Sequence, residues 1–186
     1  MSNETYNKFD SARRLPSVSI SYLKKNAPVV WKILKYSTNP YGQDDLTTAQ
    51  INSLIMSQWS SDAVNKYAVL PIRFSGQALS GQQLQLRVSL WSGDTINPLT
   101  ARVRILLQFI CANDACVIST PYSVAEDRAF ALMQESIKVL VGADLPGIGT
   151  VLNMNGTQDR NVGWQAVKFN DNYCGYECVL SCLTQQ

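Results

Sequence analysis

The sequence predicts an α+β fold in which one long and one shorter helix pack on a mostly antiparallel sheet, preceded by an extended N-terminal arm. Residues 84–91 and 101–111 alternate between apolar and polar side chains, as half-buried strands do. Two segments with apolar residues at helical spacing begin at capping-box sequences. The residues before 45 are basic and broken by three prolines. We therefore predict an extended basic arm over residues 1–44 and a single α+β domain over residues 45–186.

The charge of the chain is unevenly distributed. Its 186 residues suit one domain with an arm. The formal net charge of +2 is too small to indicate a nucleic-acid-binding protein. Up to Tyr36, however, seven basic and two acidic residues give a net charge of +5, which leaves −3 for the rest. The basic arm has two interpretations: it contacts a phosphate backbone or an acidic neighbour, or it is a solvated tail.

Short apolar runs follow the polar residues 1–14. Val18, Ile20 and Tyr22 alternate as in a short strand or in an extended arm that docks by one face. Residues 29–36 fit either a strand or one helical segment. No run approaches the roughly 18 apolar residues that cross a bilayer, and residues 1–14 lack the apolar centre of a secretory signal. We expect no membrane contact and a cytoplasm-like compartment with reduced thiols.

The first helix of the domain is expected to start at Thr47, because Thr47 and Gln50 have capping-box spacing. Apolar residues then recur on one helical face: Ile51, Leu54, Ile55 and Trp59. Residues 63–68 suggest a second, short helix. Residues 69–75 suggest a strand, and Pro71 within it favours a position at the edge of the sheet.

The clean alternation of residues 84–91 and 101–111 predicts two strands. Gly93 and Pro98 in the link between them predict a hairpin loop. A long helix follows at about residues 123–141, with Ser123 and Glu126 at capping-box spacing and Gly142 just beyond its end. Strands are expected at residues 150–154, 164–169 and 173–183, and residues 170–172 turn the last two into a hairpin.

No catalytic, cofactor or metal site is predicted, so we expect no enzyme and no cofactor. The chain has no histidine, which removes the commonest general base and metal ligand. Cys174, Cys178 and Cys182 share one face of a strand, but neighbouring thiols about 13 Å apart are too distant to share a zinc ion. Cys111 and Cys116 also lack zinc-knuckle spacing. We interpret all five cysteines as small apolar core residues, while a disulfide among them stays open. Residues 147–149 are interpreted as a tight turn.

Seven residues are candidates for an interface. They lie on the outward side of the two best strands or on the arm: Trp91, Arg87, Arg102, Arg104, Lys24, Lys25 and Trp31. Trp91 falls on the outward face of its strand, where a tryptophan can anchor a protein interface. The alternative is that the arm covers Trp91 and its strand face as a second core.

Four segments carry a resemblance to a known family: VRILLQFICA at 103–112, PYSVAEDRAFALMQESIKVL at 121–140, LPGIGTVLNM at 145–154 and NYCGYECVLSC at 172–182. Over roughly the last 90 residues the chain resembles tail-completion and neck proteins of tailed bacteriophages. In that family a strand leads to a long helix, a glycine turn, a strand and a final strand with aromatic residues around a glycine.

The resemblance implies a structural role in the virion, assembled in the host cytoplasm. Identical copies would form a ring as a tail terminator or head–tail connector, with portal, neck or tail-tube proteins as neighbours. The basic arm would reach a neighbouring subunit or the DNA channel. The chain departs from compact terminators in its first 45 or so residues, so its position in the neck stays open.

Two other classes of function compete with this one. The first is a nucleic-acid-binding module that uses the basic arm, for which binding to DNA would depend strongly on salt. The second is an enzyme without histidine, which predicts a deep polar pocket with a perturbed lysine or carboxylate.

Overall fold

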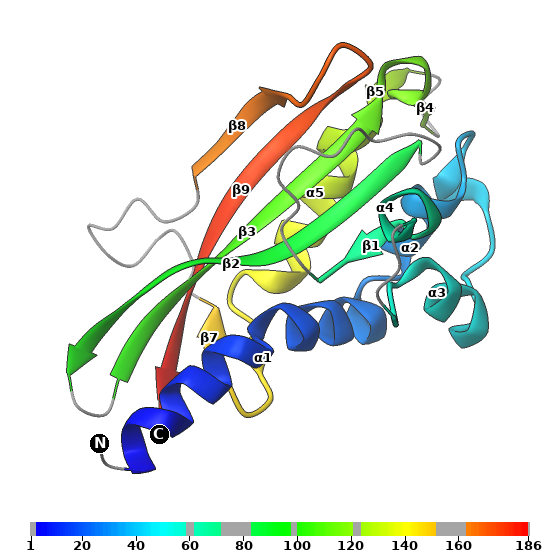
Figure 1. The fold of residues 1–186 in the computed structure, drawn as a ribbon. Helices are drawn as coiled ribbons and strands as arrows, with labels where there is room; N and C mark the ends of the chain where they lie inside the picture. The colour runs from blue at the N-terminus through cyan, green and yellow to red at the C-terminus, as the bar shows by residue number, and fades with distance from the viewer. Residues whose placement is uncertain are drawn as a thin grey trace.

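A computed structural model describes residues 3–58, 62–71, 83–97, 100–120, 124–151 and 163–185. They form a mixed α and β structure around a curled, mostly antiparallel sheet (Figure 1). None of the described helices is both long enough and apolar enough to cross a membrane. The coarse α+β prediction is therefore confirmed, and the differences lie in individual elements.

The main sheet has seven strands. Along it lie β1 (Val69–Leu70), β2 (Leu84–Asn97), β3 (Thr100–Ala112), β9 (Tyr173–Gln185), β7 (Gly149–Val151) and β6 (Asp144–Leu145). β8 (Gly163–Lys168) pairs with β9 next to the β7 pairing. Among the strands of the described residues only β1 and β2 pair in parallel, besides an isolated parallel bridge from Ile55 to Val69, and β1 ends the strand order, as Pro71 predicted. Residues 72–75 of that expected strand lie outside the described residues. β4 (Val117–Ser119) and β5 (Ala125–Asp127) form a separate two-stranded sheet.

The β2–β3 hairpin is confirmed, but its loop is shorter than predicted. Both strands continue through much of the link, with Asp94 opposite Arg102 and Asn97 opposite Thr100. The register shifts between Leu90 and Ser92, where a bulge places Trp91 between two paired positions. The β8–β9 hairpin is also confirmed: in its turn Asn172 N donates to Asn170 Oδ1 at 2.8 Å, and Phe169 N donates to Tyr173 O at 3.0 Å.

The expectation of an extended N-terminal arm is wrong, because this segment is helical. It forms α1 (Asn3–Asn26) and α2 (Pro28–Lys35), followed by a 3-10 turn at Pro40–Gly42. The alternation at Val18, Ile20 and Tyr22 concealed a helical stripe of buried residues: Leu15, Pro16, Ser19, Ile20 and Leu23. Pro16 lies inside α1 and Pro28 at the start of α2, where a proline needs no hydrogen-bond partner for its nitrogen.

The other helices are α3 (Thr48–Leu54), α4 (Ala63–Lys66) and α5 (Arg128–Leu140). The capping box of Thr47 and Gln50 is confirmed, whereas Trp59 lies outside the described residues. The long helix begins later than predicted, at Arg128, because Asp127 caps it by accepting from Phe130 N. Gly142 follows its end with φ 79°, as the glycine prediction required.

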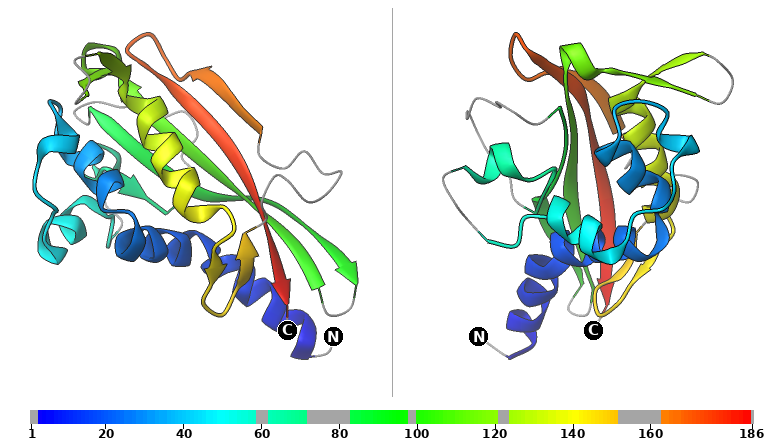
Figure 2. Two further views of the ribbon diagram at one scale, coloured as in Figure 1. Left: turned by 180° about the vertical axis from the view of Figure 1, so that it is seen from behind. Right: turned by 90° about the vertical axis from the view of Figure 1, so that its right-hand side faces the viewer.

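One hydrophobic core lies between the sheet and the layer formed by α1, α2 and α5 (Figure 2). Alternate residues of the central strands point into it: Leu84, Leu86 and Val88, then Ile105, Leu107 and Phe109, then Cys178, Leu180 and Cys182. Trp31 of α2 and Leu132 of α5 belong to the same core. The N-terminal helices therefore share the core of the strands that follow them.

A buried cation joins α2 to α5. Arg128 is 1% exposed, and its Nε and Nη2 donate to Ile33 O at 3.2 and 2.9 Å. Nη2 also donates to Tyr36 O at 3.0 Å. Because the last carbonyls of a helix lack helical partners and carry its negative dipole end, they suit a guanidinium. Burial lowers the pKa of Arg128, which is the cost of placing a charge here.

Gly175 offers a test of the close approach between β3 and β9. Its φ is 155°, and a Cβ there would overlap the carbonyl oxygen of Phe109. We expect Gly175→Ala to lower the free energy of unfolding by about 2 kcal/mol or more. Gly163→Ala on β8 is the matched control, because no atom of the described residues lies within 4 Å of its added Cβ. Urea unfolding of both variants measures the difference, and equal stabilities would contradict this packing.

Candidate interface on the distal face of the sheet

The distal face is the side of the sheet turned away from α1, α2 and α5. Since side chains alternate along a strand, it carries the residues between the core positions. These are Arg87 and Ser89 on β2, Arg102, Arg104, Leu106 and Gln108 on β3, Glu177, Val179 and Ser181 on β9, and Gln165 on β8. Leu106 and Ser181 are 1% exposed, so parts of this face are already buried within the chain.

A polar row crosses the distal face. The register places Arg87 opposite Gln108, Gln108 opposite Glu177 and Glu177 opposite Gln165. Gln108 Nε2 donates to Glu177 Oε1 at 2.6 Å, and Gln165 Nε2 donates to Glu177 Oε2 at 3.4 Å. Arg87 Nε donates to Gln85 Oε1 at 2.8 Å, and burial lowers the pKa of Arg87 to about 10. Side-chain hydrogen bonds of this row thus link β3, β9 and β8, and Arg87 bonds to Gln85 within β2.

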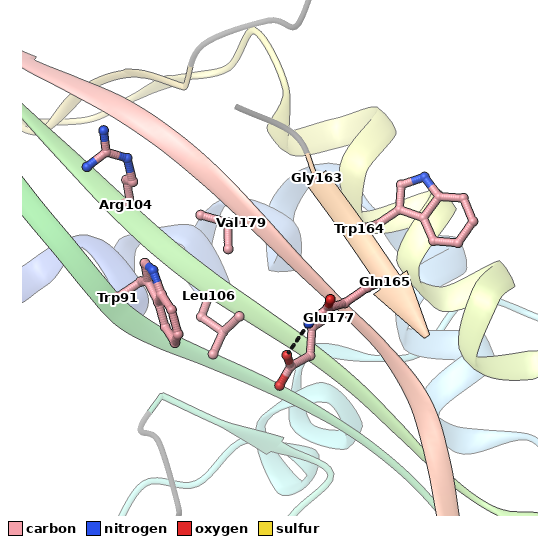
Figure 3. A pocket seen from close by; sticks show the side chains of 8 residues that line it. All are labelled: Trp91, Arg104, Leu106, Gly163, Trp164, Gln165, Glu177 and Val179. Atoms are coloured by element: carbon pink, nitrogen blue, oxygen red, sulfur yellow. Dashed lines mark hydrogen bonds between the residues drawn. The ribbon is translucent and has the colours of Figure 1, made fainter. Parts of the chain in front are cut away.

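Beside this row lies a groove of about 400 Å³ (Figure 3). Trp91 lines it from β2, Arg104 and Leu106 from β3, and Glu177 and Val179 from β9. The Trp91 side chain is 48% exposed, while Arg104 Nη1 is paired with Asp94 Oδ1 at 2.9 Å. The groove thus combines an exposed indole, apolar walls and one carboxylate, a composition that suits contact with another protein surface.

Trp164 belongs to the groove by its backbone, but its ring lies on the other side of the sheet (Figure 3). There it makes edge contacts with Phe130 and Tyr176, with ring centroids 5.5 and 5.9 Å away. Tyr176 donates its hydroxyl to Asp127 Oδ2 at 2.9 Å, so the cap of α5 is tied to β9. Trp164 nevertheless stays 53% exposed.

Four of the seven predicted interface residues are brought together on the distal face. Trp91 and Arg104 line the groove, and Arg87 and Arg102 lie on the same face, although Arg87 is only 4% exposed. Gln165 and Glu177 were missed. The alternation of side chains along β8 and β9 could have identified them, because it places both residues on the face opposite the cysteines of β9.

The three residues predicted on the arm lie elsewhere. Lys24 Nζ donates to Asn52 Oδ1 at 2.6 Å on α3, and Lys25 is exposed on α1. The prediction for Trp31 is wrong: it is 0% exposed, and its Nε1 donates to Leu23 O at 3.1 Å inside the core. The alternative of a second core is also wrong, because α1 and α2 pack with α5 on the opposite side of the sheet from Trp91.

The cysteine interpretation is confirmed for Cys111, Cys178 and Cys182, which are buried, and wrong for Cys174, which is exposed. All five thiols are free. Burial raises the pKa of Cys111, Cys178 and Cys182 to about 12. In the part of the chain that the structure describes, no three side chains of metal-binding type gather closely enough to hold an ion.

These buried thiols predict a loss of stability at high pH. An unfolded thiol ionises near pH 9, whereas Cys182 in the fold stays neutral to about pH 12. The buried thiol makes its full contribution to the free energy of unfolding below pH 9. That contribution is lost as the pH rises from 9 to 12, by up to about 1.4 kcal/mol per pH unit. We expect Cys182→Ala to reduce the slope of unfolding free energy against pH, measured in urea with reductant from pH 8 to 10.5. Identical slopes for the wild type and the variant would show that the thiol titrates alike in both states.

Comparison of the chain with protein-family models, with curated proteins and with solved structures finds no match in any of the three.

Proposed function

We propose that this chain is a structural virion protein of a tailed bacteriophage that forms a homo-oligomeric ring in the neck or tail. Its role there is tail termination or head–tail joining. It works by binding copies of itself and neighbouring portal, neck or tail-tube proteins, without catalytic turnover and without a cofactor. The virion is its final location, after assembly in the host cytoplasm.

The observation that carries this proposal is the position of the exposed apolar side chains. Six large ones are exposed among the described residues, and four of them lie on β2 or β8: Leu90, Trp91, Ile96 and Trp164. Exposed apolar residues that gather on outer strands favour contact with other chains.

The resemblance supports the same proposal through the order of its segments. Residues 103–112 lie in β3, and the described part of residues 121–140 contains β5 and α5. The glycine turn joins β6 to β7, and residues 173–182 lie in β9. Strand, long helix, turn and final strand thus follow one another as in the proteins that the chain resembles.

A nucleic-acid-binding module is the second candidate. Arg13, Arg14 and Lys25 are exposed on α1, so the basic segment presents its charge on a helix. A helix with a cationic surface can contact the phosphate backbone without reading bases. Within the ring proposal the same surface would face a neighbouring subunit or the DNA channel.

The native mass of the purified chain tests the proposal. We expect a closed ring of about six or twelve copies in native mass spectrometry and in electron micrographs, since cyclic assemblies close at a fixed number of subunits. The measurement should span protein concentrations up to about 1 mM, because weak interfaces populate only there. A chain that stays monomeric throughout, and that binds DNA with a steep salt dependence, would favour the second candidate instead.

A further inference from the structure

The sheet has an incompletely paired strand at each side. On one side β1 pairs with β2 only at Leu86 and Arg87, and beyond them β2 continues to Asn97. On the other side β8 pairs with β9 along one edge. In the described residues no strand lies along the outer edge of β8 or along β2 beyond Arg87. Such edges present rows of backbone donors and acceptors to other chains.

Each edge carries a single charged residue, and both of these charges are paired within the chain. Asp94 is the one charged residue between Ser89 and Asn97, and its carboxylate is occupied by Arg104. Lys168 is the one charged residue of β8, and it pairs with Asp171 of its own turn at 2.8 Å. Edge strands of monomers are typically blunted by lysine or proline. Apart from these two charged residues, both edges carry exposed apolar residues.

The strand directions make the two edges complementary. From one side to the other the order is β2, β3, β9 and β8, and each neighbouring pair is antiparallel. Four alternating strands leave β2 and β8 running in opposite directions. When a second copy stands beside the first in the same orientation, its β2 therefore meets β8 in an antiparallel manner. This head-to-tail contact repeats from copy to copy, as a ring requires.

The position of β1 sets the stagger of such a contact. At one level across the sheet Lys168 aligns with Cys174, Cys111 and Leu84. When β8 of one copy pairs with β2 of the next, it must lie beyond Leu86 and Arg87, which β1 already occupies. Lys168 of the first copy then lies opposite about Ser89 of the second copy instead of Leu84. This is a shift along the strands of about five residues, or about 17 Å. The four strands of one copy span about 19 Å across the sheet, so the strands shift by about 17 Å for every 19 Å around the ring. The implied strand tilt of about 40° lies within the range that closed sheets adopt, about 35–45°.

We propose that the β2 edge of one copy pairs in an antiparallel manner with the β8 edge of the next, so that the sheets of all copies join into one closed sheet around the ring. The occupant of each edge is a second copy of this chain. This inference rests on the proposed function, because it specifies which surfaces close the ring.

Backbone hydrogen bonds identify the outward N–H groups. Phe169 N donates to Tyr173 O, so by antiparallel alternation Val167 and Gln165 also face β9, and the N–H of Ala166 points outward. On β2, Leu86 N donates outward to Ala68 O of the segment that ends in β1. Past the bulge, the same alternation directs the N–H of Gly93 outward.

Proline at these two positions removes one outward donor and keeps the bonds within the sheet. The test variants are Gly93→Pro and Ala166→Pro. Their matched controls are Gly93→Ala, whose Cβ has its nearest neighbour at 3.5 Å, and Ala166→Ser at an exposed position. Circular dichroism and urea unfolding check the fold of each variant, and native mass spectrometry measures its assembly.

We expect the controls to form the wild-type ring and each proline variant to be a folded monomer. An equimolar mixture of the two variants should give heterodimers and nothing larger, because only one intact β8 edge and one intact β2 edge then meet. Rings formed by either proline variant would overturn the inference while leaving the proposed function in place. A homodimer of one variant would also overturn it, in favour of two-fold pairing of like edges. A wild-type chain that stays monomeric overturns both proposals.

Lysine variants keep the test decisive if a proline variant unfolds. Ile96→Lys and Ala166→Lys place a charge on each edge at exposed positions and leave the backbone unchanged. We expect each to weaken assembly at least about 10-fold, as edge lysines oppose strand addition. Unchanged assembly in both would overturn the inference.

Discussion

The rest of the structure depends on Arg128, which holds the C-terminal end of α2 against the start of α5. A buried guanidinium is costly unless its donors are satisfied, and the carbonyls of Ile33 and Tyr36 satisfy two of its nitrogens. The backbone N–H of Arg128 also donates to Cys116 O at 2.8 Å, which fixes the connection from β3. With α1 and α2 placed in this way, helices cover one face of the sheet, and the other face and the edges are left for the assembly that we propose.

Most strands of the sheet could be predicted from the sequence, whereas the packing of the N-terminal helices could not. Alternation in β2, β3 and β9 and the turn at residues 170–172 are local signals, because each strand of this kind buries one face. The segment of α1 carries both a period of two, in Val18, Ile20 and Tyr22, and a helical stripe, in Leu15, Ser19 and Leu23. The choice between them depends on contacts of α1 with β2 and α5, both distant in the chain, which local patterns do not contain.

The sequence could predict which side chains point to the outer face of the sheet, but not which of them line one groove. Alternation placed Trp91 and Arg104 outward, and the structure brings them to one groove. The bulge at Trp91 and the pairing of β8 with β9 decide what else lies there, and both depend on register. Trp31 illustrates the opposite error, since this tryptophan near basic residues on the expected arm is the largest fully buried side chain among the described residues.

We propose that copies of this chain meet through the edges of the sheet, while the helical layer stays within each chain. Hydrogen–deuterium exchange tests it directly by comparing amide protection in the assembled particle and in the diluted monomer. We expect slower exchange on assembly in residues 92–97 of β2 and in Gly163–Lys168, and no change in α2 and α5. Equal exchange of both edge strands in the two states, with new protection on the helices instead, would contradict the claim.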